Sequence, residues 1–195
     1  MTTDTSVVTA ERFSTGIPSF EAWMEAIPER HKEFQRHYDE YTPDAADIAA
    51  VAELVSTRGV KALALGEHWC PDVWRGVPIM ARIAEGTGME VRYFPRYENK
   101  DIMGEFLNQG EFESVPTIVF YDGAHNYLGH WIERPALANE QMVELRKILD
   151  AAPKEDGPEK TEAGLRYREA TWAAAPAWRD ASLKEMRQLI ENGLS

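Results

Sequence analysis

Residues 66–73 read GEHWCPDV and residues 114–121 read SVPTIVFY, and these two stretches decide the fold. The first lies between a short apolar run and a predicted helix, so Cys70 stands where a strand ends and a helix begins. In the second, Pro116 directly precedes residues 117–121, whose β-branched and aromatic side chains predict the clearest strand of the chain.

The pattern around these stretches predicts a mixed sheet covered by helices, which is an α/β fold. Short apolar or alternating runs indicate strands, and apolar residues at helical spacing indicate helices. In chain order the elements are strand 61–65, helix 78–85, strand 90–94, helix 102–110, strand 117–121, strand 126–132 and helix 142–149. Asp122 and Gly123 give a turn signal between the last two strands, which therefore form a predicted hairpin.

Helical segments flank this unit on both sides. Residues 1–59 predict an N-terminal helical extension, in which Thr42 caps one of the helices. Residues 60–151 form the predicted core. Residues 152–195 begin with a polar linker, 152–162, and continue as a helix too apolar to be a free tail. We therefore expect that helix to pack back on the core.

Charge and composition exclude several classes of partner. The chain has 195 residues and a net charge of −12, so nucleic acid and an anionic membrane surface would both repel it. No apolar stretch is long enough for a signal peptide or a membrane span, so neither is expected. A single cysteine excludes an intramolecular disulfide. A reducing, cytoplasmic setting is the expectation, and the oligomeric state stays open.

Cys70 is the residue whose placement suggests chemistry. Unpaired N–H groups and the helix dipole favour an anion at a helix N-terminus, and the thiolate is the reactive form of cysteine. His68 and Arg75 could add positive charge nearby, whereas Asp72 would oppose a thiolate, so the sign of the sum stays open. Taken alone, a lone thiol is more often buried and inert, and Pro116 could simply start a strand.

Together the two stretches resemble the thioredoxin superfamily. That family has W-C-x-x-C at the start of its first core helix and I/V-P-T before its central strand. Here residues 69–72 read WCPD and residues 115–117 read VPT, about 45 residues later. The surroundings are similar to a bacterial thioredoxin-like subgroup with extra helices before the core, and the resemblance covers about residues 60–150. It implies a thioredoxin-like fold in which Pro116, with a cis peptide bond, lies beside Cys70.

The resemblance also implies which residues form the site. Cys70 would be the catalytic thiol. Trp69 and Pro71 beside it, and Val115 and Pro116 across from it, would bind the substrate. The family counterpart of Trp69 flanks the reactive sulfur and remains partly exposed.

The sequence departs from the family at two positions of this site. Val73 stands where a second cysteine usually lies, and Ala64 stands where a buried acid usually lies. Without a resolving thiol the two-cysteine cycle is unavailable. One hypothesis is a monothiol oxidoreductase acting on protein or low-molecular-weight disulfides, with glutathione as a candidate co-substrate. The other is a redox-inactive domain that binds peptide or protein in the groove between Cys70 and Pro116.

No metal or other cofactor is predicted. His68, His125 and His130 lack the paired spacing of a metal site, and no glycine-rich phosphate loop occurs. Arg96 and Arg134 follow predicted strand ends. They could hold an anion such as a glutathione carboxylate, or form surface salt bridges.

Overall fold

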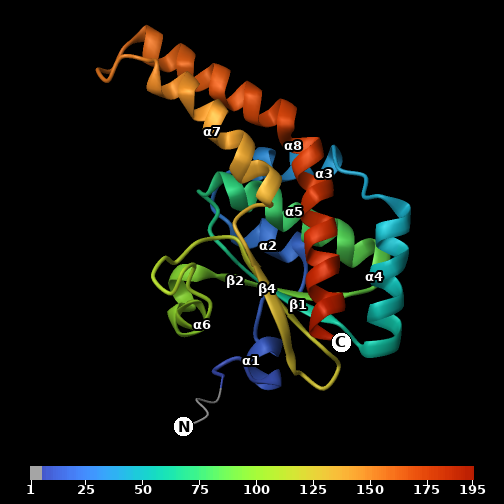
Figure 1. Ribbon diagram of the computed structural model, residues 1–195. Coiled ribbons are helices and arrows are strands. Elements are labelled where there is room, and N and C mark those ends of the chain that lie inside the picture. Colours follow the sequence, from blue (N-terminus) through green and yellow to red (C-terminus); the bar gives the residue numbers. More distant parts are fainter. Residues whose placement is uncertain (1–5) are drawn as a thin grey trace.

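A four-stranded sheet lies at the centre of the computed structural model, which describes residues 6–195 (Figure 1). Its strands pack in the order β2-β1-β3-β4, with β1 parallel to β2 and antiparallel to β3, and β3 antiparallel to β4. The bounds are β1 (Lys61–Gly66), β2 (Glu90–Pro95), β3 (Thr117–Tyr121) and β4 (Tyr127–Ile132). All four predicted strands are confirmed to within one residue at each end, including the hairpin. The predicted α/β fold, a mixed sheet covered by helices, is therefore confirmed.

Helices cover both faces of the sheet. Successive residues of a strand point to opposite faces, and β4 shows what covers each one. Trp131 donates from Nε1 to Glu185 of α8 (Pro158–Gly193) at 2.9 Å. The next residue back, His130, contacts the ring of Phe106, which ends α6 (Lys100–Glu105). Thus α8 lies on one face and α6 on the other.

Residues 6–59 contain four helices and pack on the sheet unit, and residues 1–5 of the predicted extension lie outside the described residues. The helices are α1 (Ala10–Ser14), α2 (Phe20–Ala26), α3 (His31–Asp39) and α4 (Ala45–Arg58). The predicted cap at Thr42 is wrong, because the side chain of Asp44 accepts the N–H groups of Ala46 and Asp47 instead. Asp44 thereby satisfies two of the free donors at the start of α4.

Two predicted helix boundaries in the core are corrected. The helix expected from residue 78 is α5 (Pro71–Thr87), in which Pro78 lies inside and is buried. Packing of this helix outweighs the hydrogen bond that an internal proline removes. The helix expected to end at Gly110 ends at Glu105, because Asn108 and Phe112 exchange backbone hydrogen bonds of 2.8 and 2.9 Å in a turn.

The C-terminal helices form a projecting arm. α7 (Ala136–Asp150) extends away from the body, and the first part of the 36-residue α8 runs back beside it (Figure 1). The remaining part of α8 crosses β4. The expected linker is shorter than residues 152–162, because α8 already begins at Pro158. Within residues 6–195, no helix combines the length and apolar character that a membrane span requires.

Candidate functional site

Cys70 and Pro116 are brought together by the fold. Cys70 is the N-cap residue of α5, and its Sγ donates to the carbonyl oxygen of Val115 at 3.5 Å, across 45 residues of sequence. The peptide bond between Val115 and Pro116 is cis, as the resemblance implied. The thiol therefore lies where a helix N-terminus meets the loop that precedes β3.

Gly76 allows α5 to approach Pro116 closely. A Cβ atom at this position would lie 2.6 Å from Cγ of Pro116, closer than real Cβ contacts allow. The proline ring is rigid, so either the loop or the helix would have to move. The glycine thus fixes the distance between the Cys70 helix and the Pro116 loop.

Replacing Gly76 by alanine is expected to lower the free energy of unfolding. Overpacking costs about 1–3 kcal/mol, whereas the better helix propensity of alanine returns about 1 kcal/mol, so we expect a net loss of about 1 kcal/mol. The matched control is Gly164→Ala in α8, where a Cβ meets nothing within 4 Å and only the propensity gain remains. Urea denaturation of both variants should give opposite signs, and equal signs would contradict the close contact.

The thiol is half-buried, and this decides its protonation. Burial raises the pKa of Cys70 above its ordinary value, the backbone N–H of Val73 lowers it, and the charge of Asp72 raises it again. The N–H of Asp72 and the charge of Arg75 add smaller lowering effects. The sequence left open the net effect of these groups on the pKa of Cys70. In the structure that pKa is raised, so the resting thiol is protonated at neutral pH.

The side chain of His68 lies beside Glu29. Its Nε2 lies 4.0 Å from a carboxylate oxygen of Glu29, and its backbone oxygen accepts the indole N–H of Trp74 at 2.5 Å. Of the three expected modulators, Asp72 raises the pKa of Cys70 and Arg75 lowers it, whereas His68 pairs with Glu29.

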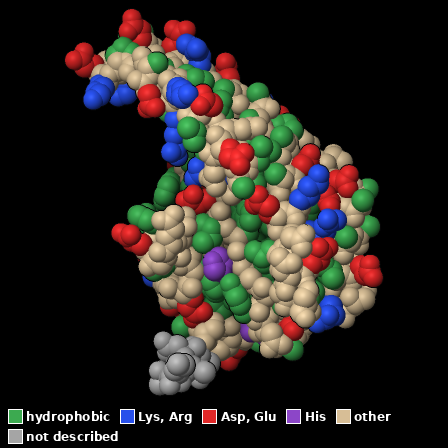
Figure 2. Space-filling model, viewed as in Figure 1, with side chains coloured by type: hydrophobic (Ala, Val, Ile, Leu, Met, Phe, Trp, Pro, Cys, Tyr) green, Lys and Arg blue, Asp and Glu red, His purple; other side chains and the backbone are tan. Residues whose placement is uncertain are grey.

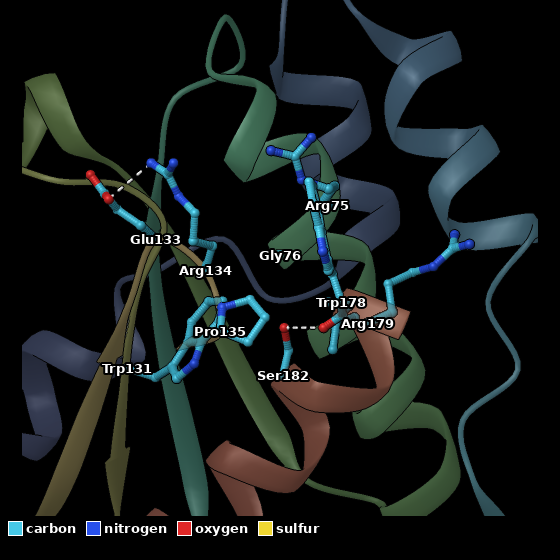
Figure 3. Close-up of a pocket in the computed structure, with 10 residues that line it drawn as sticks. Arg75, Gly76, Trp131, Glu133, Arg134, Pro135, Trp178, Arg179 and Ser182 are labelled. Carbon is cyan, nitrogen blue, oxygen red and sulfur yellow. Dashed lines mark hydrogen bonds and ion pairs between the residues drawn. The ribbon is translucent and has the colours of Figure 1, made fainter. Parts of the chain in front are cut away.

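Asp72 joins two arginines beside the site. One carboxylate oxygen pairs with Arg75, and the other pairs with Arg134 at 3.0 Å. Arg134 follows β4 and also pairs with Glu133 at 3.0 Å. Figure 3 shows the guanidinium groups of Arg75 and Arg134 directed to the same side of this region. Arg134 was expected to bind an anion or to form a salt bridge, and in the structure it forms salt bridges with Asp72 and Glu133.

Asp72→Asn is expected to accelerate alkylation of Cys70 at neutral pH. Removing the carboxylate removes one cause of the raised pKa and leaves Arg75 in place, so the thiolate fraction increases. One pKa unit would be a roughly tenfold faster reaction, which is the upper end of what we expect. The rate with iodoacetamide measures this, with Glu144→Gln on the exposed face of α7 as the control. A slower or unchanged rate would contradict the electrostatic role.

An aromatic rim beside Cys70 was only partly predicted. Trp69 is 44% exposed and Tyr97 is 59% exposed, and their ring centroids lie 6.5 Å apart. The guanidinium carbon of Arg96 lies 4.2 Å from the Tyr97 ring, and Arg96 also donates to the Glu113 backbone oxygen at 3.1 Å. Trp69 was predicted from the family motif, whereas the only sequence signal for Tyr97 is its position just after β2.

Buried Glu67 places Tyr97 at this rim. Its carboxylate accepts the backbone N–H of Tyr97 at 2.7 Å, and its own backbone oxygen accepts the N–H of Cys70 at 3.1 Å. One residue therefore connects the end of β1, the cysteine and the segment after β2. No pattern in the sequence marks Glu67 as part of the site.

The remaining predicted positions lie where the resemblance implied. Pro71 is exposed in the first turn of α5, and Val73 is fully buried behind it. Ala64 is buried within β1. In contrast, His125 and His130 pack with aromatic rings around β4. Among residues 6–195 no group of three His, Cys, Asp or Glu side chains has a metal-site arrangement.

Comparisons with known proteins agree with this architecture. A family model described as Thioredoxin matches residues 17–152. A solved protein of unknown function from Pseudomonas aeruginosa aligns with a TM-score of 0.66 and 16% identity, over 94% of this chain and 96% of that one. An HIV epitope-scaffold aligns with a TM-score of 0.64 and 18% identity, over 93% and 96%. These two structures support the fold alone. None of the curated proteins matches significantly.

Proposed function

The chain belongs to the thioredoxin family, and on that premise we propose that it is a monothiol thiol–disulfide oxidoreductase acting through Cys70. The observation that carries the proposal is the position of the sulfur at the N-terminus of α5, 3.5 Å from the Val115 carbonyl beside Pro116. Backbone N–H groups of Asp72 and Val73 favour the thiolate once it forms.

The exchange proceeds in two balanced steps. The Cys70 thiolate attacks one sulfur of a substrate disulfide, a Cys70–sulfur bond forms, the substrate S–S bond breaks, and the departing thiolate takes up a proton. A low-molecular-weight thiolate such as glutathione then attacks the substrate sulfur of the adduct. This restores the Cys70 thiolate and leaves the former substrate sulfur in a disulfide with glutathione. No further oxidant or reductant is needed for this interchange.

The loop before β3 supports binding of an extended substrate. Within the described residues 6–195, the backbone N–H of Val115 donates to no acceptor. An extended segment laid beside Val115 could accept this hydrogen bond, as an added strand does. Trp69 and Tyr97 would then cover the reacting sulfur from the side.

A second candidate is favoured by the burial of the thiol. A raised pKa leaves little thiolate at neutral pH, which suits a domain that binds peptide in the same groove without turnover. In that case the sulfur acts only as a small, half-buried apolar group.

Adduct formation separates the two candidates. The protein is incubated with oxidised glutathione at neutral pH, and its mass is measured before and after reduced glutathione is added. Because Cys70 is the single cysteine, one reversible adduct per chain supports the oxidoreductase. If the folded chain forms no adduct while the urea-unfolded chain reacts rapidly, the oxidoreductase is excluded and the peptide-binding domain is supported. Because the pKa of Cys70 is raised by burial, the alkylation rate should rise with pH through a midpoint above that of a free cysteine thiol.

A further inference from the structure

A cleft of about 690 Å³ lies beside the Cys70 helix, between α3, the first turns of α5, α7 and α8. Its volume is in the range of small-molecule sites. The cavity in Figure 3, by contrast, holds about 10 Å³, which is room for about one water molecule. Of these two cavities, only the cleft has room for an organic ligand.

Positive charge gathers in this cleft. Its walls carry six arginines and no lysine, namely Arg30, Arg36, Arg75, Arg134, Arg146 and Arg168. Three carboxylates face them, Glu33, Asp72 and Glu169. Figure 2 shows basic side chains in the concave angle where the arm meets the body. A local excess of positive charge in a chain of net charge −12 is the opposite of what composition predicts.

Arg30 and Arg36 pair with neighbouring glutamates, and the other four arginines fall into two sets that differ in their partners. Arg75 and Arg134 share Asp72, which holds them close together at the base of the cleft. Within residues 6–195, Arg146 on α7 and Arg168 on α8 have no ion pair with a carboxylate. The second set is therefore free to pair with an incoming anion. Guanidinium groups bind carboxylate and phosphate oxygens in pairs, which lysine cannot do.

The cleft also has an apolar lining and an unsatisfied polar group. Trp74, Met142 and Tyr167 lie among the arginines. His37 is only 2% exposed, and its Nδ1 is buried without a hydrogen-bond partner. An inorganic ion would leave the apolar walls unused, whereas an organic body would cover them.

We propose that the cleft between α3, α5, α7 and α8 binds a small organic molecule bearing at least two carboxylate or phosphate groups. One group pairs with Arg146 and Arg168, and the other lies towards Arg75 and Arg134. The assignment does not depend on the thiol reaction at Cys70 and goes beyond it.

Binding is tested on the full chain with citrate and with fructose 1,6-bisphosphate as separate organic probes, by calorimetry at constant ionic strength set with sodium chloride. Arg168→Gln is expected to weaken binding at least about tenfold, since a hydrogen-bonded charge is lost. The matched control is Arg166→Gln, also exposed on α8 but outside the cleft, which should bind as the unmodified chain does. Both variants should unfold at the same urea concentration in the absence of probe.

The outcomes divide clearly. Binding of fructose 1,6-bisphosphate alone assigns phosphate groups to the ligand, binding of citrate alone assigns carboxylates, and binding of both supports the shared chemistry. Binding of neither probe at millimolar concentration would overturn the proposal. Equal weakening by Arg166→Gln and Arg168→Gln would also overturn it, because only overall charge would then matter. Cys70→Ser should bind both probes unchanged, which tests the cleft apart from the thiol.

Discussion

Val73→Cys is expected to let the adduct at Cys70 release itself without an external thiol. The new thiol lies three residues after Cys70 on the inner face of α5, where it can attack the Cys70 sulfur of the adduct and expel the substrate as a thiol. In the unmodified chain the adduct has no internal thiol to attack it and should persist. We expect release over minutes to hours, since Val73 is fully buried and Ala64 offers no proton acceptor.

The control for this variant is Val73→Ala, which removes the same two methyl groups and adds no sulfur. Isolated adducts of both variants are followed by mass spectrometry in buffer free of thiols. Release from Val73→Cys alone would show that the missing resolving cysteine is what makes Cys70 dependent on an outside thiol. Equal persistence of the two adducts would show that the geometry at Val73 cannot support the second attack.

Trp178→Ala is expected to cost about 3–5 kcal/mol of stability, because a large buried side chain leaves a cavity. Trp178 is 2% exposed at the base of the arm, where it packs in a small core with Ala138 and Met142. Its indole N–H donates to Gln141 of α7 at 2.8 Å, and the guanidinium carbon of Arg75 lies 5.4 Å from its ring. The midpoint temperature of thermal unfolding should fall by roughly ten degrees.

Leu165→Ala tests whether this cost belongs to the arm base and not to α8 in general. Leu165 is 47% exposed on the same helix, so its truncation should change stability by less than about 0.5 kcal/mol. If Trp178→Ala unfolded at the temperature of the unmodified chain, α8 would not be part of the cooperative core.

The sequence predicts the sheet well because its strands carry strong local signals. Residues 117–121 form β3 as expected, since a strand buried on both faces is a continuous run of β-branched and aromatic residues. Helix starts were harder to place. Thr42 and Asp44 are both good capping residues two positions apart, and only the backbone geometry decides that Asp44 accepts the free N–H groups.

The site could be predicted only where a motif carries it. The proximity of Cys70 and Pro116 follows from two stretches that resemble one family. The direction of the pKa shift at Cys70 does not, because burial of the sulfur is a property of the packed chain. The arginine cleft was not predicted at all, since its walls come from four segments and no local pattern joins Arg146 to Arg75.

The neutral state of His37 makes acidification costly for this fold. Burial, together with the charges of Arg75 on α5, Arg179 on α8 and Arg36 on its own helix, lowers its pKa from 6.5 to about 3. Between these two pH values His37 is protonated in the unfolded chain but neutral in the folded chain. The free energy of unfolding therefore decreases as pH falls from about 6.5 towards 3. Acid therefore weakens the packing of α3 against α8, because protonation of His37 would place a charge beside three arginines.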